Sequence, residues 1–89
     1  MPCLHIHISG KVQGVSFRYY VLKEAQRRGV FGWVKNLEDG RMEVVAQGKE
    51  EELQQLTRLC RKGPLYAEVE KVDVKEVPEQ KLEGFEIRY

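Results

Sequence analysis

A short segment of the chain places an arginine beside two glycines at a predicted helix start, a combination suited to binding phosphate. The segment from Gly10 to Arg18 follows an alternating, strand-like run and precedes a helical one, and Ser16 is a plausible N-cap. A helix start carries partial positive charge and unpaired N–H donors, so a cation there costs about 0.3–1 kcal/mol. Gly10 and Gly14 would let the backbone approach an anion closely. We therefore expect this segment to form an anion site.

The second predicted helix follows the usual charge rule, which makes the first one exceptional. Its first turn holds three glutamates, residues 50–52, and its last turns hold Arg58, Arg61 and Lys62. The first helix has no acidic residue before Glu24. A nearby carboxylate could neutralise Arg18, and glycines are common in turns, so each feature also has a purely structural explanation. Together they favour an anion site, and the expected anion is phosphate.

Hydrophobic periodicity predicts the elements that must position this segment. Apolar residues alternate over residues 3–8, recur at helical spacing over 17–28, and alternate again in strands over 30–37 and 42–47. The Asp-Gly step at residues 39–40 predicts a hairpin between the latter two strands. A second helix is predicted after Lys49, ending at Gly63.

The signal is weaker in the last part of the chain. Val72 and Val74 alternate but Val69 is out of phase with them, which predicts a β-bulge near Glu70 and Lys71. A short final strand is predicted from the alternation over residues 85–89. How this last strand pairs stays open.

The resulting order, βαββαβ plus a short C-terminal strand, predicts an α+β fold over residues 1–89 as a single domain. The arrangement is the split βαβ, or ferredoxin-like, sandwich: an antiparallel sheet with both helices on one face. Leu4, Ile6 and Ile8 would lie beneath the helices. The alternate residues of the same strand, which are Cys3, His5 and His7, would lie on the open face.

These open-face residues raise a metal hypothesis. Cys3, His5 and His7 have a spacing that could hold an ion, but no fourth ligand is evident and such neighbours are common on strands. We therefore expect no metal and no cofactor, and a function that a strong chelator leaves unaffected.

Composition and charge limit the classes of protein. The chain has 89 residues, 42% of them hydrophobic and 33% charged, with a net charge of +1. Residues 1–48 carry seven Lys/Arg against four Asp/Glu, whereas residues 49–89 carry eight against ten. The near-neutral charge, and the lack of aromatic residues in the two predicted central strands, disfavour an RNA-binding module. The phosphate loop of nucleotide hydrolases is also not matched.

Targeting and redox features predict a reduced cytoplasmic chain. The sequence has two cysteines, fewer than small secreted domains usually carry, and it shows no secretory apolar region. No stretch approaches the roughly 20 apolar residues of a membrane span. We expect a cytoplasmic monomer without nucleic acid or membrane partners.

Two segments resemble the signatures of the acylphosphatase family. Residues 8–18 read Ile-Ser-Gly-Lys-Val-Gln-Gly-Val-Ser-Phe-Arg, and residues 32–40 read Gly-Trp-Val-Lys-Asn-Leu-Glu-Asp-Gly, with Gly48 eight residues further on. Met42 stands where the family pattern usually has valine, a tolerable apolar exchange. The resemblance extends over essentially the whole chain.

The resemblance implies hydrolysis of acyl phosphates, in which a carboxylate and a phosphate form a mixed anhydride. It implies that Arg18 binds the phosphate and that Asn36 orients the attacking water. Backbone N–H groups would hold the remaining phosphate oxygens; they belong to Gln13, Gly14, Val15, Ser16, Phe17 and Arg18. Inorganic phosphate would be both product and competitive ligand. The alternative is a non-catalytic anion-binding regulatory module of the same fold, which would leave Asn36 unexplained.

Overall fold

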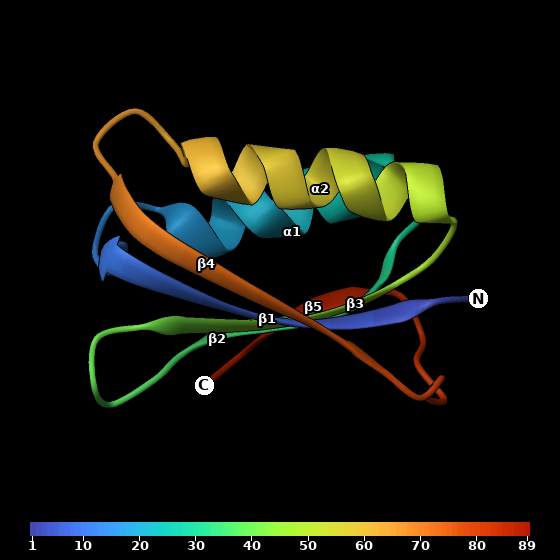
Figure 1. The fold of residues 1–89 in the computed structure, drawn as a ribbon. Helices are drawn as coiled ribbons and strands as arrows, with labels where there is room; N and C mark the ends of the chain where they lie inside the picture. The colour runs from blue at the N-terminus through green and yellow to red at the C-terminus, as the bar shows by residue number, and fades with distance from the viewer.

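Both helices form as the sequence predicts and lie together on one face of a single sheet (Figure 1). The computed structural model describes residues 1–89. In chain order the elements are β1 (Cys3–Lys11), α1 (Phe17–Arg27), β2 (Phe31–Asn36), β3 (Met42–Gln47), α2 (Glu50–Lys62), β4 (Glu68–Val77) and β5 (Phe85–Arg88). This order confirms the predicted ferredoxin-like sandwich with an additional C-terminal strand. Neither helix has the length and apolar character that crossing a membrane would require.

The sheet is mixed rather than wholly antiparallel, and its strand order is β4-β1-β3-β2-β5. β1 pairs antiparallel with β3 and β4, and β3 pairs antiparallel with β2. β5 pairs parallel with β2, from Gly32 opposite Phe85 to Lys35 opposite Arg88. The expectation of an antiparallel sheet therefore fails at one edge. The loop after β4 carries the chain to the opposite edge of the sheet, where β5 runs in the same direction as β2.

The β-bulge predicted near Glu70 and Lys71 is confirmed in β4, which is an edge strand of the sheet. Ser9 pairs with Lys71 and Gly10 pairs with Val69, so Glu70 is an extra residue in β4. A bulge of this kind increases the local twist of the strand. It lies at the end of β1, immediately before the chain leaves the sheet for the predicted anion loop.

The core lies between the sheet and the two helices. β1 contributes Ile6 and Ile8, both fully buried, while Leu4 is only partly buried. α1 buries Phe17, Val21 and Ala25, and the rings of Phe17 and Tyr20 meet edge to face with centroids 5.8 Å apart. α2 buries Leu53, Leu56 and Cys60, which share one face of the helix.

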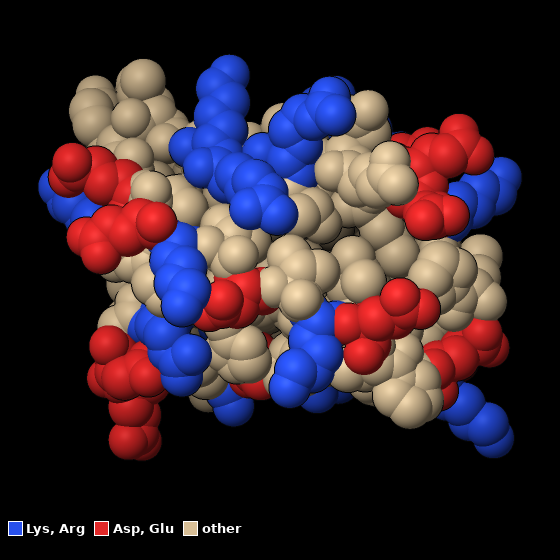
Figure 2. Space-filling view, in the orientation of Figure 1, with Lys and Arg blue, Asp and Glu red and all other residues tan.

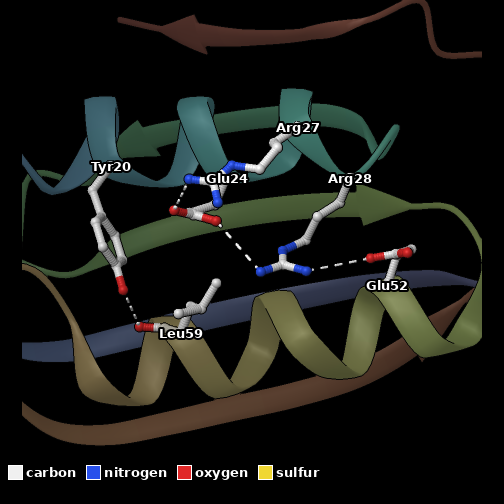
Figure 3. A network of polar contacts seen from close by, with 6 residues as sticks. All are labelled: Tyr20, Glu24, Arg27, Arg28, Glu52 and Leu59. Atoms are coloured by element: carbon white, nitrogen blue, oxygen red, sulfur yellow. Dashed lines mark hydrogen bonds and ion pairs between the residues drawn. The ribbon is translucent and has the colours of Figure 1, made fainter.

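Polar contacts fix the two helices to each other at their solvent-facing seam (Figure 3). Arg28, which follows α1, lies between Glu24 of α1 and Glu52 of α2, with N···O distances of 3.5 and 3.4 Å. The Tyr20 hydroxyl donates a hydrogen bond of 3.2 Å to the Leu59 carbonyl. These contacts join α1 to α2 near both ends of α1.

The open face of the sheet differs from the prediction at Cys3. His5 and His7 lie there, partly exposed, but Cys3 is only 1% exposed. The loop after β4 folds over this end of the face, since the Gln47 amide donates to the Gln80 carbonyl and the Gln80 N–H donates to Gln47 Oε1. Cys3 pairs with Gln47 in the register of β1 and β3 and is covered with it. Burial raises the pKa of the Cys3 thiol.

Candidate active site

The direction of the strands brings the predicted site residues to one end of the sheet, where several strands terminate. β1, β2 and β5 run in the same direction, so their C-terminal ends lie together. α1 also begins at this end of the sheet, because the loop that precedes it follows β1 directly. Ile8 and Asn36 both pair with Met42, and Arg88 pairs with Lys35, which places Tyr89 beside the end of β2. Three distant segments thus converge at the start of α1.

A cavity of about 340 Å³ opens at this point. It contains both residues that were predicted to act on the substrate, Arg18 and Asn36. Four of the six predicted loop residues line it, whereas Gln13 and Val15 do not. The complete lining is Val12, Gly14, Ser16, Phe17, Arg18, Tyr19, Asn36, Ile87 and Tyr89.

The loop before α1 turns through left-handed backbone at Gly14, with φ +73°, and at Ser16, with φ +62°. Ser16 is the only non-glycine residue of the chain with positive φ, a conformation that costs about 1–3 kcal/mol. Ser16 occupies the N-cap position, but its hydroxyl makes no capping hydrogen bond. The predicted side-chain cap is therefore wrong, because a capping serine has extended backbone and this one is left-handed.

The uncapped loop leaves its N–H donors free for an anion. The first helical bond runs from the Tyr20 N–H to the Ser16 carbonyl at 3.0 Å. No backbone hydrogen bond within the protein is donated by residues 13–16. Unpaired backbone N–H groups at a helix start, next to residues with left-handed backbone, are typical of an anion-binding concavity.

Arg18 forms no ion pair, which removes the structural explanation considered for it. The arginines that do form ion pairs are Arg27, Arg28, Arg41 and Arg88. The Arg18 guanidinium instead lies against the ring of Tyr89, with Cζ 4.9 Å from the ring centroid. α1 also has no acidic residue in its first turn. Positive charge in the cavity is therefore not neutralised by the protein.

Asn36 ends β2 with its side chain on the helix side of the sheet. Its register partner Met42 is fully buried on that side. Asn36 Oδ1 is buried and has no hydrogen-bond partner in the protein. A buried carboxamide oxygen without a partner is costly, and a water molecule is a suitable partner.

The side chain of Gln13 has a role that the sequence did not reveal. Its Nε2 donates to the carbonyls of Leu37 and Arg41, at 2.7 and 3.0 Å. These carbonyls belong to the β2–β3 hairpin, which closes through a bond from the Leu37 N–H to the Arg41 carbonyl. The N–H and guanidinium of Arg41 also lower the pKa of the Asp39 carboxyl in this hairpin. Gln13 therefore ties the anion loop to the segment that follows Asn36.

Replacing Gln13 by alanine is expected to lower kcat/KM for a substrate bound in this cavity about tenfold. The reason is that small displacements of the loop amides from their positions reduce the rate of reaction. The rise in KM should match a weaker inhibition by inorganic phosphate, because the loop amides are displaced. Gln26→Ala, at an exposed position of α1, is the matched control. Loss of stability with unchanged kcat/KM would show that Gln13 is only structural.

Two exposed tyrosines also lie at the cavity. Tyr19 and Tyr89 are 57% and 93% exposed and line the cavity together with Arg18. No periodicity indicates this, because the position of Tyr89 depends on the parallel pairing of β5. Cys60 cannot compete as a nucleophile, because burial in the core raises the pKa of its thiol to about 12.

A larger groove, about 620 Å³, lies between α2 and the outer edge of the sheet, lined by Leu4, Leu53 and Val74 among others. It contains none of the residues that the sequence motifs indicate. Figure 2 shows both basic and acidic side chains on this side of the molecule, with several basic ones grouped near the top of the view. The larger groove also includes Arg58 and Arg61, which form no ion pair, so the smaller cavity is distinguished by holding Arg18 and Asn36 together and not by unpaired charge alone.

Comparison with known proteins gives a consistent result. The family model "Acylphosphatase" matches residues 4–87. An acylphosphatase of Pseudomonas paraeruginosa is 48% identical over 86 residues, covering 97% of this chain and 94% of that protein. The crystal structure of acylphosphatase from Bacillus subtilis superposes with a TM-score of 0.96 at 39% identity, covering all of both chains. An acylphosphatase structure from Coxiella burnetii gives 0.94 at 40% identity, covering 98% of this chain and 92% of the other.

Proposed function

Because the chain belongs to the acylphosphatase family, we propose that Arg18 and the loop amides bind the phosphate of its substrate and that Asn36 orients the attacking water. The family assignment makes the chain a hydrolase that cleaves the carboxyl–phosphate anhydride bond of acyl phosphates. One observation supports the residue roles above all. A single cavity combines an unpaired guanidinium, free amide donors and a carboxamide oxygen without a partner.

Phosphate binding uses the N–H groups of residues 13–18 and the Arg18 guanidinium. The loop amides and the helix start hold two of the phosphate oxygens, and the planar guanidinium matches the phosphate through paired donors. Contact with Tyr89 restricts the guanidinium without neutralising it. These donors gain strength as charge develops on the transferred phosphoryl group.

The attacking water is held by Asn36 in line with the bond that breaks. Its oxygen forms a bond to phosphorus while the bond from phosphorus to the acyl oxygen breaks, and the electron pair leaves with the carboxylate. The carboxylic acid product has a pKa of about 4, so the leaving group needs no proton. Phosphoryl transfer through a loose transition state depends mainly on positioning and electrostatics.

The water proton goes to an oxygen of the substrate phosphate. No aspartate, glutamate, histidine or cysteine lines the cavity, so the lining offers no ordinary general base. Side chains of these types also hold catalytic metals. We therefore propose that the reaction requires no metal or cofactor.

The test is a spectrophotometric assay with a simple aryl acyl phosphate. We expect hydrolysis that a strong chelator leaves unchanged and that inorganic phosphate inhibits competitively. Phosphate binding without turnover would instead indicate the non-catalytic anion-binding module. Loss of activity with the chelator would contradict the metal-free reaction.

We also propose that residues 1–89 act as one domain, as a monomer in the cytoplasm without nucleic acid or membrane partners. Cys3 and Cys60 are both free, as expected in a reducing compartment. They lie on opposite faces of the sheet, so they are not placed to form a disulfide. Sedimentation analysis of the purified chain tests the monomer.

A further inference from the structure

Two histidines and a glutamate converge on the open face of the sheet, across β1 and β3. His5 and His7 are neighbours on this face of β1, with ring centroids 4.6 Å apart. Glu43 of β3 pairs with His7 in register. Glu43 Oε2 lies 2.6 Å from His5 Nε2 and 3.7 Å from His7 Nε2. His5 and His7 are the only histidines of the chain, so both imidazoles are in this cluster.

We propose that His5, His7 and Glu43 form a binding site for a divalent ion that prefers imidazole, with Zn²⁺ as the reference ion. The site is separate from the phosphate cavity and plays no part in hydrolysis. Cys3, considered with the histidines in the sequence, is buried at the covered end and is not part of it. Glu43 supplies the third ligand instead, from a strand that sequence spacing could not relate to β1.

The spacing of the three side chains suits tetrahedral coordination. Zn²⁺ binds imidazole nitrogen and carboxylate oxygen at about 2.0–2.2 Å, which places ligand atoms about 3.3 Å apart. One potential ligand atom from each residue lies within 4.8 Å of the others, so small side-chain rotations are sufficient. The histidine side chains are 31% and 27% exposed, so water can reach the remaining coordination position.

Neighbouring charges do not by themselves create this site. Lys75 pairs with His5 and Lys35 pairs with Glu43, and both disfavour a cation, whereas Asp73 pairs with His7 and favours one. Affinity must therefore come from coordinate bonds to imidazole. Hard cations such as Mg²⁺ prefer oxygen ligands, so they are expected to bind poorly.

Binding at this cluster should stabilise the folded chain, because it joins the two central strands. The unfolded chain keeps the two histidines close in sequence but separates them from Glu43. An ion that binds the folded state preferentially raises the unfolding temperature as its concentration rises.

The test is Zn²⁺ titration of the full chain in a buffer free of phosphate and chelator, by calorimetry and by thermal unfolding. We expect one ion per chain and a rise in Tm that Mg²⁺ does not produce. His7→Gln and Glu43→Gln should each weaken Zn²⁺ binding at least about tenfold, since even groups that only support ligands contribute that much. Glu86→Gln is the matched control, because it removes a carboxylate from the same face two strands away.

Circular dichroism establishes that each variant is folded, and Glu43→Gln retains an amide able to hydrogen-bond to His5. The Co²⁺ absorption spectrum gives a second readout of direct imidazole coordination. Wild-type protein without saturable Zn²⁺ binding at micromolar concentration would overturn the proposal. Binding that persists in both variants would overturn it as well. Hydrolysis of the acyl phosphate should be the same in His7→Gln as in the wild type.

Discussion

Arg18→Ala is expected to lower kcat/KM for an aryl acyl phosphate about a thousandfold or more, the scale of a lost arginine finger in phosphoryl transfer. The guanidinium has no ion pair in the protein, so its charge is available to the substrate phosphate. Inhibition by inorganic phosphate should weaken as well, because the phosphate loses its charged donor. Steady-state kinetics with and without phosphate measure both effects.

Controls separate this loss from a structural effect. Arg27→Ala makes the same substitution at the other end of α1, where the ion pair to Glu24 is exposed and contributes little. Its activity should equal that of the wild type. Arg18→Lys keeps the charge but loses the planar donor pair, so its activity should be intermediate. Since the helix start disfavours a cation, Arg18→Ala should unfold no earlier in urea than the wild type. Marked destabilisation would mean that Arg18 is structural.

Asn36→Ala is expected to reduce kcat by about a hundredfold or more while inorganic phosphate binds with nearly unchanged affinity. The reason is that the carboxamide is proposed to hold the water and not the phosphate, and removal of one positioned group typically costs this much. Measuring kcat together with the inhibition constant of phosphate separates these roles. Asn36 Oδ1 has no partner in the protein, so no internal hydrogen bond is broken.

Gln54→Ala is the control for this variant, because it removes an exposed carboxamide from α2, away from the cavity. It should leave both constants unchanged. A parallel loss of phosphate affinity in Asn36→Ala would contradict the water-holding role. It would place the side chain on the phosphate instead.

The sequence predicted what depends on local pattern and failed where distant segments meet. Alternation and helical spacing located every element, and the bulge at Glu70 followed from the phase of Val69. The parallel pairing of β5 was open, and with it the position of Tyr89 at the cavity. Cys3 was assigned to the exposed face from the alternation of its strand. That alternation gives no information about the loop at Gln80, which covers Cys3.

The candidate site shows the same division. Charge placement and motif resemblance singled out Arg18 and Asn36, and the fold brings both into one cavity. The left-handed backbone of Ser16 was missed because serine is usually a capping residue with extended backbone. For Gln13 the sequence indicated only a role for its N–H, because the carbonyls that its side chain contacts belong to hairpin residues 24 and 28 positions away in sequence.

The strand order also affects how fast the chain can fold. β1 is synthesised first, yet both of its partners, β3 and β4, follow much later in the sequence. Closing these long loops costs chain entropy before β1 can form hydrogen bonds with either partner. This cost slows folding relative to a helical bundle of equal size. The loop proposed to bind the substrate phosphate follows β1 directly, so we expect it to acquire its shape only after β1 has paired.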